Sequence, residues 1–210
     1  MSAKAALLVV DLQLDFLPGG ALGVADGDAI LEPVSDLIAS ARFPLVIATQ
    51  DWHPRGHVSF ASSHPGRSPF DEVDLHGRPQ TLWPDHCVQG TPGAGLHPSL
   101  PVEPLAAIVR KGMDPAVDSY STFRNTCDGR GERPPTGLAG YLRERSVEEV
   151  WLVGLARDFC VLWSAEDAAD AGFRVRVLWD LTRPVDPTSD ERVARALAAR
   201  GVEVAGGVGG

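Results

Sequence analysis

Six short apolar runs recur along the chain, and this recurrence constrains its fold more than any other feature. The runs occupy residues 5–10, 44–49, 105–109, 149–155, 174–179 and 202–205. The first four are almost continuously apolar, which is typical of parallel strands that are buried on both faces. The last two are shorter or more mixed in polarity, and we therefore expect them nearer an edge of the sheet.

Segments with helical character separate most of these runs. We predict helices at residues 26–41, 136–146, 160–171 and 188–200. Pro33 fits the first segment only if it lies in the first helical turn. Thr136 is a suitable N-cap for the second helix. Gly172 and Gly201 follow the last two segments, as glycines do where a helix ends.

The alternation of strands and helices predicts an α/β fold. We expect residues 1–210 to form one domain with a doubly wound, mostly parallel, six-stranded sheet and helices on both faces, a Rossmann-like three-layer arrangement. Two segments interrupt the alternation, residues 50–101 and 112–135, and neither holds a long periodic element. Loops of this length are uncommon unless they serve a function, so we interpret residues 50–101 as a functional insertion.

Composition excludes several classes of protein. The 210 residues suit a single core, and the net charge of -9, without a basic stripe, argues against nucleic-acid binding and against anionic membranes. The apolar run at residues 5–10 is too short for a signal peptide or a membrane span. Three widely spaced cysteines do not form a disulfide framework, which points to a protein of the reducing cytoplasm.

Polar residues follow four of the predicted strands. Asp11, Asp51, Lys111 and Cys160 all lie at or just beyond carboxyl ends, where open α/β sheets bind their ligands. A thiol near a helix N-terminus, with an ammonium and a carboxylate beside it, has the composition of an activated nucleophile. The residues alone leave other interpretations open: an inert buried cysteine, a solvated lysine and an aspartate that caps a turn.

The segment DWHPRGH raises the question of a metal site. Asp51 and His53 place a carboxylate and an imidazole on neighbouring positions at a strand end. A third ligand from the loop would complete a catalytic metal site, with His86 the first candidate and His57 the second. This donor set suits one divalent ion, Zn²⁺ in preference to Mn²⁺ or Fe²⁺. The alternative is a solvated loop that happens to contain histidines.

Five segments, in order, are similar to one known family. LLVVDLQLDFLPGGALGVADGD, IATQDWHPRGHVSFASSHPG, LWPDHCVQGTPGAGLHP, IVRKGMDPAVDSYSTF and LVGLARDFCV resemble the nicotinamidases, also called pyrazinamidases, of the isochorismatase-like hydrolase superfamily. The segments run from residue 7 to about residue 161 and so cover most of the chain. The pair QDWHP and WPDHCV resembles the metal-binding branch of that superfamily.

The resemblance implies a role for individual residues. It implies a catalytic triad of Asp11, Lys111 and Cys160. It implies metal ligands at Asp51, His53 and His86, with His57 and Ser59 as outer or alternative metal-site residues. It implies an oxyanion hole made by the backbone N–H groups of Ala156 and Cys160, and substrate-binding aromatic residues at Phe16, Trp83, Tyr120 and Phe159. It also implies a cis peptide bond between Leu155 and Ala156.

The activity implied by the resemblance is metal-dependent hydrolysis of nicotinamide to nicotinate and ammonia through a thioester on Cys160, in NAD salvage. Pyrazinamide would be hydrolysed to pyrazinoate in the same way. Two residues depart from the family pattern: Leu14 stands where Asn is usual, and Arg157 stands where Thr is common. Because Arg157 lies beside the implied oxyanion segment, it raises a question about substrate preference and rate.

Three other functions are compatible with parts of this sequence. An isochorismatase or an N-carbamoyl amidase of the same superfamily would share the fold, but simple isochorismatases need no metal. A catalytically silent metal-binding protein would not need the implied triad. A nucleotide-binding module fits the fold, yet the chain has neither a G-x-G-x-x-G motif nor a P-loop. The partner we expect is a small-molecule substrate, and the sequence leaves a homo-oligomer open.

Overall fold

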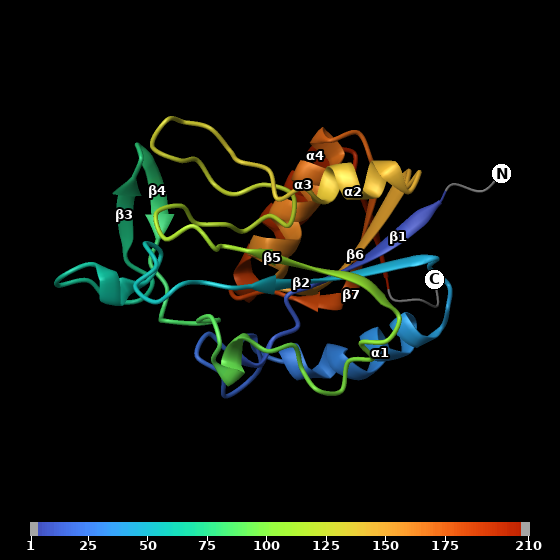
Figure 1. The fold of residues 1–210 in the computed structure, drawn as a ribbon, viewed down its shortest axis with the longest axis horizontal. Helices are drawn as coiled ribbons and strands as arrows, with labels where there is room; N and C mark the ends of the chain where they lie inside the picture. Colours follow the sequence, from blue (N-terminus) through green and yellow to red (C-terminus); the bar gives the residue numbers. More distant parts are fainter. Residues whose placement is uncertain (1–3, 207–210) are drawn as a thin grey trace.

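A single parallel sheet organises the chain in a computed structural model that describes residues 4–206 (Figure 1). Its strand order is β5-β2-β1-β6-β7-β8, and every neighbouring pair is parallel. The strands are β1 (Ala5–Val10), β2 (Leu45–Asp51), β5 (Leu105–Lys111), β6 (Glu149–Leu155), β7 (Arg174–Arg183) and β8 (Glu203–Ala205). All six predicted strands are confirmed, as are the parallel sheet and its helix-covered faces.

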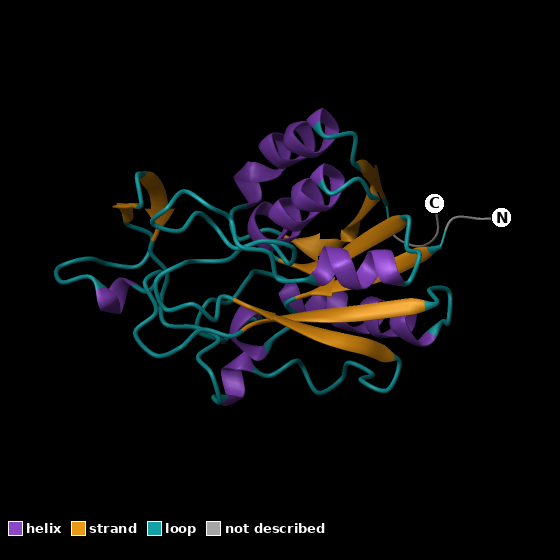
Figure 2. Cartoon of the chain, turned by 45° about the horizontal axis from the view of Figure 1, so that its top comes forward, coloured by secondary structure: helices purple, strands orange, loops and turns teal. Residues whose placement is uncertain are grey.

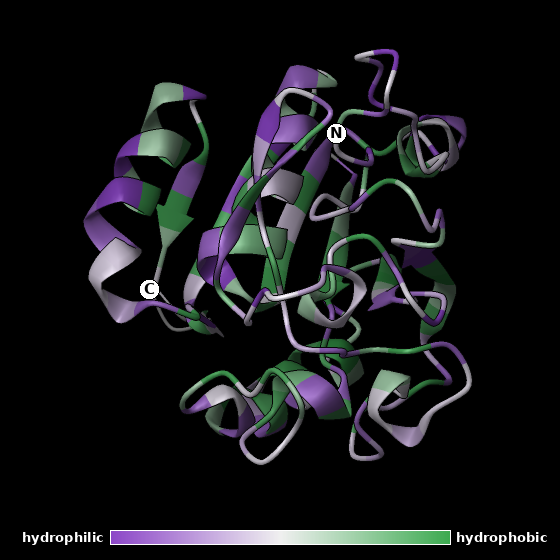
Figure 3. Cartoon of the chain, turned by 90° about the vertical axis from the view of Figure 1, so that its left-hand side faces the viewer, coloured by the Kyte–Doolittle hydropathy of each residue, from purple (hydrophilic) through white to green (hydrophobic). Residues whose placement is uncertain are grey.

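Helices cover both faces of the sheet (Figures 1 and 2). They are α1 (Leu31–Ala39), α2 (Leu138–Glu144), α3 (Leu162–Asp170) and α4 (Asp190–Ala199). Side chains of β1 alternate between two cores: Leu7 and Val9 pack with α1, whereas Leu8 and Val10 pack with the other three helices. The apolar residues are concentrated in these two layers beside the sheet (Figure 3).

One strand differs from its prediction. Residues 105–109 were expected to be buried on both faces, but β5 alternates between half-buried and exposed residues, and Ile108 is 47% exposed. β5 is the edge strand and pairs only with β2. The helices centre on the inner strands, so one face of β5 remains in contact with solvent.

The helix boundaries also need correction. The first helix begins at Leu31 rather than at residue 26, because Gly27–Ile30 form a separate 3₁₀ turn. The N-cap of α2 is Gly137, although the hydroxyl of Thr136 still accepts the N–H of Leu138 at 3.3 Å. Pro33 lies in the first turn of α1 as predicted. Gly172 and Gly201 follow α3 and α4 with φ of +88° and +68°, which confirms the predicted helix ends.

The insertion at residues 50–101 holds an element that the sequence analysis missed. β3 (Glu72–Leu75) and β4 (Arg78–Thr81) form an antiparallel hairpin beyond the carboxyl ends of the sheet strands (Figure 1). Its turn residues, His76 and Gly77, both have positive φ, which the two-residue turns of hairpins require. The remaining regular structure of the insertion is limited to short 3₁₀ turns, Ala61–Ser63 and Pro92–Ala94.

Within the described residues, no helix combines the length and the apolar character that a membrane crossing would need.

Close contact between two strands generates a first prediction. Gly154 of β6 pairs with Val10 of β1 and has φ of +111°. A Cβ atom there would lie 2.0 Å from the carbonyl oxygen of Val10. We expect Gly154→Ala to lower the free energy of unfolding by about 3 kcal/mol or more, measured by urea denaturation.

Gly140 provides the matched control. It is exposed in α2, and a Cβ atom there would meet nothing within 4 Å. Gly140→Ala should therefore raise the free energy of unfolding by about 0.5–1 kcal/mol. Equal effects of the two substitutions would contradict the packing described for β1 and β6.

Candidate active site

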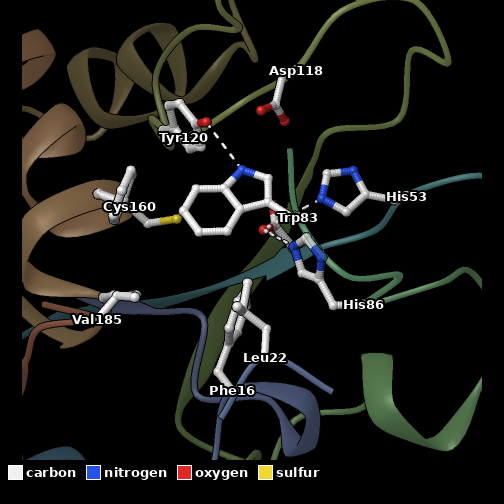
Figure 4. Close-up of a pocket in the computed structure, with 12 residues that line it drawn as sticks. Phe16, Leu22, His53, Trp83, His86, Asp118, Tyr120, Cys160 and Val185 are labelled. Carbon is white, nitrogen blue, oxygen red and sulfur yellow. Dashed lines mark hydrogen bonds and ion pairs between the residues drawn. The ribbon is translucent and has the colours of Figure 1, made fainter. Parts of the chain in front are cut away.

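A pocket opens beyond the carboxyl ends of the central strands (Figure 4). Its walls outline a space of about 350 Å³, part of which is open to solvent. Cys160 lies on one side of it, His53 and His86 lie on the other, and Trp83 lies between them. Its walls are formed by Phe16, Leu22, Asp51, His53, Trp83, His86, Asp118, Tyr120, Ala156, Phe159, Cys160 and Val185.

A buried lysine joins the ends of three strands below this pocket. The ammonium of Lys111, at the end of β5, lies 2.9 Å from Asp11 Oδ2 and also forms an ion pair with Asp51 Oδ1. It donates to the carbonyl oxygen of Ser119 at 3.2 Å and approaches the sulfur of Cys160 at 3.3 Å. Lys111 is 1% exposed, so its charge depends on these neighbours rather than on water.

The two carboxylates beside Lys111 respond differently. Burial acts to raise the pKa of Asp51, but Lys111 and His53 outweigh it and hold that pKa well below its usual value. Burial also raises the pKa of Asp11, and here the opposing effect of Lys111 does not suffice. Thr49 steadies Asp11 by donating to Oδ1 at 2.6 Å. Asp51 is thus the fixed negative charge, and Asp11 is the carboxylate better suited to accept a proton.

Cys160 lies in a single π-helical turn, Arg157–Val161, that leads into α3. Burial and the neighbouring Asp11 and Asp51 raise its pKa well above the usual value, and Lys111 offsets only part of this effect. The sulfur therefore rests as a thiol. A thiolate can form here when the proton passes to an adjacent base and Lys111 stabilises the resulting negative charge.

The predicted metal ligands converge on one point. His53 Nδ1 lies 3.0 Å from the carbonyl oxygen of Gly112, and His86 Nδ1 lies 2.8 Å from that of Pro84. A carbonyl oxygen can only accept, so in the neutral form of each ring Nδ1 carries the proton and Nε2 has the lone pair. The two Nε2 atoms face Asp51 Oδ2 at 3.5 and 3.8 Å. One carboxylate oxygen and two imidazole nitrogens gathered in this way fit a divalent cation.

A glycine fixes the position of the first of these histidines. Gly112 has φ of +67°, and a Cβ atom on it would lie 2.4 Å from Cε1 of His53. The chain therefore needs glycine directly after Lys111 for His53 to reach its position. Lys111 and the glycine that packs against the His53 ring are therefore consecutive residues.

His57 and Ser59 lie outside the cluster around Asp51. The ring of His57 packs against that of His53, with centroids 4.2 Å apart. Its Nδ1 lies 2.8 Å from Ser59 Oγ, and its Nε2 lies 3.3 Å from the carbonyl oxygen of Val117. Burial and His53 lower the pKa of His57 to about 4, so it is neutral at physiological pH. Both of its nitrogens have protein partners, which favours a supporting position over that of a ligand.

Aromatic side chains form the rest of the pocket. The ring of Trp83 meets Phe159 edge-on at 4.8 Å, and Tyr120 lies 5.5 Å from Phe159. Phe16 packs against His86 at 5.5 Å from below (Figure 4). All four aromatic residues named from the sequence line the pocket. A space with aromatic walls of this kind suits a small flat ring.

The segment between β6 and the π turn carries the peptide groups implied for an oxyanion. The peptide bond between Leu155 and Ala156 is cis, which confirms that prediction. Ala156 and Cys160 both line the pocket. The two residues implied for the oxyanion hole therefore lie on the same pocket wall.

The two departures from the family pattern lie away from the pocket. Arg157 is buried, but its guanidinium points toward β7 and α4, where it donates to Thr182 and forms an ion pair with Asp190 at 2.8 Å. It also stacks on Trp179 at 3.9 Å. Leu14 is half-buried, and its N–H donates to Gly95. The position of Arg157 raised a question about substrate preference and rate, and in this geometry its side chain does not line the pocket.

Three pocket residues were missed by the sequence analysis: Leu22, Asp118 and Val185. Leu22 and Val185 are ordinary aliphatic residues that give no chemical signal, although Val185 lies two residues beyond the end of β7. Asp118 lies in a long loop after β5, seven residues from Lys111, and only that proximity could have drawn attention to it. The backbone of Val185 is positioned by Asp158, which accepts its N–H at 2.8 Å.

Several known proteins are similar to this chain in sequence and in fold. The isochorismatase domain family matches residues 5–207. A nicotinamidase of Acinetobacter baylyi is 45% identical over 199 residues, which are 94% of this chain and 90% of that protein. The structure of a nicotinamidase pyrazinamidase of Acinetobacter baumanii superposes with a TM-score of 0.91 at 41% identity, covering 99% of this chain and 98% of its own. The structure of a Pyrococcus horikoshii pyrazinamidase in complex with zinc superposes with a TM-score of 0.77 at 35% identity, covering 97% of this chain and 99% of its own.

The buried charges around Lys111 generate a second prediction. Lys111→Met leaves Asp11 and Asp51 buried without their cation, and we expect a loss of about 3–5 kcal/mol in the free energy of unfolding at pH 7. The pKa of each carboxylate should rise in the variant, so protonation relieves the repulsion as the pH falls. The difference from the wild type should therefore shrink toward pH 4. Urea denaturation at several pH values measures it, and a difference independent of pH would contradict this account.

The contacts of Arg157 generate a third prediction. Arg157→Met should lower the free energy of unfolding by about 2–4 kcal/mol, because Asp190 and two carbonyl oxygens lose their donor. The ratio of the rates on nicotinamide and pyrazinamide, the substrates named for the relatives, should not change. Arg157→Lys keeps the charge without the planar fork and should recover only part of the stability. A changed substrate ratio in a folded Arg157→Met protein would contradict the assignment.

Proposed function

The chain belongs to the isochorismatase family, and from that premise we propose that it hydrolyses nicotinamide to nicotinate and ammonia. Pyrazinamide, which carries the same carboxamide on a similar ring, is the second substrate we propose. The observation that carries the proposal is the contact of Lys111 with both Asp11 and Cys160 below a small aromatic pocket. The relative from Acinetobacter baylyi named above is a nicotinamidase, and the match covers 90% of its length. The reaction would supply nicotinate for NAD salvage.

Cys160 is the proposed nucleophile. Asp11, with its raised pKa, accepts the proton of the thiol, and Lys111 stabilises the thiolate. The sulfur attacks the carboxamide carbon, and the negative charge moves to the carboxamide oxygen. The N–H groups of Ala156 and Cys160 stabilise that oxyanion, for which loss of one donor costs about 3–4 kcal/mol.

Asp11 then serves as the acid. It returns its proton to the leaving nitrogen, the C–N bond breaks, ammonia departs, and a thioester on Cys160 remains. In the second half of the reaction, Asp11 takes a proton from water as the water attacks the thioester carbon. The C–S bond breaks, nicotinate forms, and the sulfur recovers its proton. One carboxylate thus alternates between base and acid.

Asp51, His53 and His86 are the residues that would hold a divalent metal. When bound, such an ion acts as a Lewis acid toward a ring nitrogen or a water molecule. We propose Zn²⁺, because two imidazoles and one carboxylate suit it and because a related pyrazinamidase binds zinc. Residues 50–101 supply His53 and His86, and we propose that they are the metal-site insertion of a single domain.

The aromatic walls give the proposed substrate its orientation. Phe16 and Trp83 would hold the ring, while Tyr120 and Phe159 close the side nearer Cys160. The ring nitrogen would then face His53 and His86, and the carboxamide would face the sulfur (Figure 4). The ends of the pocket therefore match the two polar ends of nicotinamide.

The fourth prediction tests this function directly. We expect ammonia release from nicotinamide by the wild-type protein and a loss of at least about 10⁴-fold in Cys160→Ala, because no covalent step remains. Removal of metal with a chelator should abolish most activity, and added Zn²⁺ should restore it. Coupled detection of ammonia and quantification of bound metal measure both effects.

Cys127→Ala serves as the control, since this cysteine lies outside the pocket described here and should not affect the rate. Ammonia release by Cys160→Ala at the wild-type rate would refute the nucleophile. An intact, metal-loaded protein with no activity on nicotinamide or pyrazinamide would refute the substrate assignment.

A further inference from the structure

The β3–β4 hairpin contributes a single buried side chain. Its eight strand residues are exposed or half-buried except for Gln80, which is 5% exposed. The hairpin forms its own two-stranded sheet and does not pair with the central sheet. Exposed polar strands of this kind add little apolar burial. The interactions of Gln80 are therefore the clearest indication of what the hairpin does.

The amide of Gln80 donates toward the active pocket. Its Nε2 lies 2.7 Å from the carbonyl oxygen of Thr81, 2.7 Å from Asp118 Oδ2 and 3.0 Å from the hydroxyl oxygen of Tyr120. Asp118 also accepts the N–H of Ser119 at 2.8 Å through Oδ1. Both oxygens of Asp118 thus accept from N–H groups. Within residues 4–206, no ion pair of Asp118 with a lysine or an arginine is found.

The chain of hydrogen bonds continues to the pocket wall. Trp83 Nε1 donates to the hydroxyl oxygen of Tyr120 at 3.1 Å (Figure 4). Burial and the nearby Asp118 raise the pKa of Tyr120 well above its usual value, so the hydroxyl keeps its proton. Because Trp83 Nε1 donates to the hydroxyl oxygen, the proton of that hydroxyl is free to point toward Asp118. Gln80, Asp118 and Tyr120 together determine where the indole N–H of Trp83 can point.

We propose that Gln80 and Asp118 are positioning residues that fix the indole of Trp83 through Tyr120, and that the β3–β4 hairpin thereby sets how tightly the pocket holds a flat ring. This inference rests on the proposed function. It assigns the hairpin a role in ring affinity rather than in proton transfer, because the side-chain hydrogen bonds of Gln80 within the described residues go to Thr81, Asp118 and Tyr120 and not to Lys111, Asp11 or Cys160.

The geometry also identifies the stabilising polarity. Gln80 acts as a donor and Asp118 as an acceptor, and the pair is buried. Gln80→Glu places two carboxylates against each other. Asp118→Asn replaces one acceptor oxygen by an NH₂ group, although both oxygens of Asp118 accept from N–H groups. Exchanging donor and acceptor within the pair would restore a hydrogen bond. A hairpin that only covers the pocket would not respond to this exchange.

Three variants test the proposal: Gln80→Glu, Asp118→Asn and the double exchange Gln80→Glu/Asp118→Asn. Each single change should raise KM for nicotinamide about tenfold and change kcat less. The reason is that the indole of Trp83 is no longer held in place, while Cys160, Lys111 and Asp11 keep their positions. The double exchange should bring KM back to within about threefold of the wild type. Glu72→Gln is the control, since it removes one charge from the exposed face of the same hairpin and should leave KM unchanged.

A spectroscopic readout tests the network without any substrate. The indole N–H resonance of Trp83, assigned by its loss in Trp83→Phe, reports the hydrogen bond to Tyr120. It should shift in both single variants and in Tyr120→Phe, and it should return toward its wild-type position in the double exchange. Bound metal should be the same in every variant.

The outcomes separate this inference from the proposed function. If the wild type does not hydrolyse nicotinamide but the resonance follows the pattern above, the substrate assignment fails and the network stands. If the effects of the two single changes on KM simply add in the double exchange, so that KM does not recover, the inference is overturned. An unmoved resonance or a KM change that follows lost metal would also overturn it.

Discussion

A lysine ammonium with almost no access to water is the constraint on which the rest of the site depends. Lys111 can remain charged in the interior only because Asp11 and Asp51 lie within ion-pair distance. Asp11 directly follows β1, Asp51 ends β2 and Lys111 ends β5. The register of these three parallel strands therefore determines whether the opposite charges lie within ion-pair distance. The cost of desolvating the three groups is offset only while all of them stay in place. The sheet therefore does more than support the site, because its register determines whether the charges are compensated.

The site is divided into an electrostatic floor and an aromatic wall, which have different origins in the fold. The floor comes from strand ends and the π turn before α3, which are fixed by the two packed cores on either side of the sheet. The wall comes mainly from loops, with Trp83 in the insertion, Tyr120 in the loop after β5 and Phe16 in the first 3₁₀ turn. Asp51 connects the charged floor to the two histidines, because one of its oxygens faces Lys111 and the other faces His53 and His86.

The floor could be predicted from the sequence because its residues follow apolar runs, and parallel strands bring their carboxyl ends together. Asp11, Asp51, Lys111 and Cys160 were found in this way, and the resemblance named the aromatic wall. The β3–β4 hairpin was missed because its strands alternate weakly and its turn, His76–Gly77, lacks the usual Asn-Gly signal. The orientation of Arg157 could not be predicted either. Its partners, Thr182 and Asp190, lie 25 and 33 residues away, and only the packed structure brings them together.

The isolation of the hairpin has a consequence for how such a protein can evolve. Because β3 and β4 pair only with each other, residues at their tip can be inserted, deleted or replaced without disturbing either packed core. Selection can therefore act on the wall of the pocket while the charged floor is inherited unchanged. If selection favours a substrate with a different ring, substitutions in this hairpin are the first that the fold can tolerate. The architecture thus separates the part that must be conserved from the part that is free to diversify.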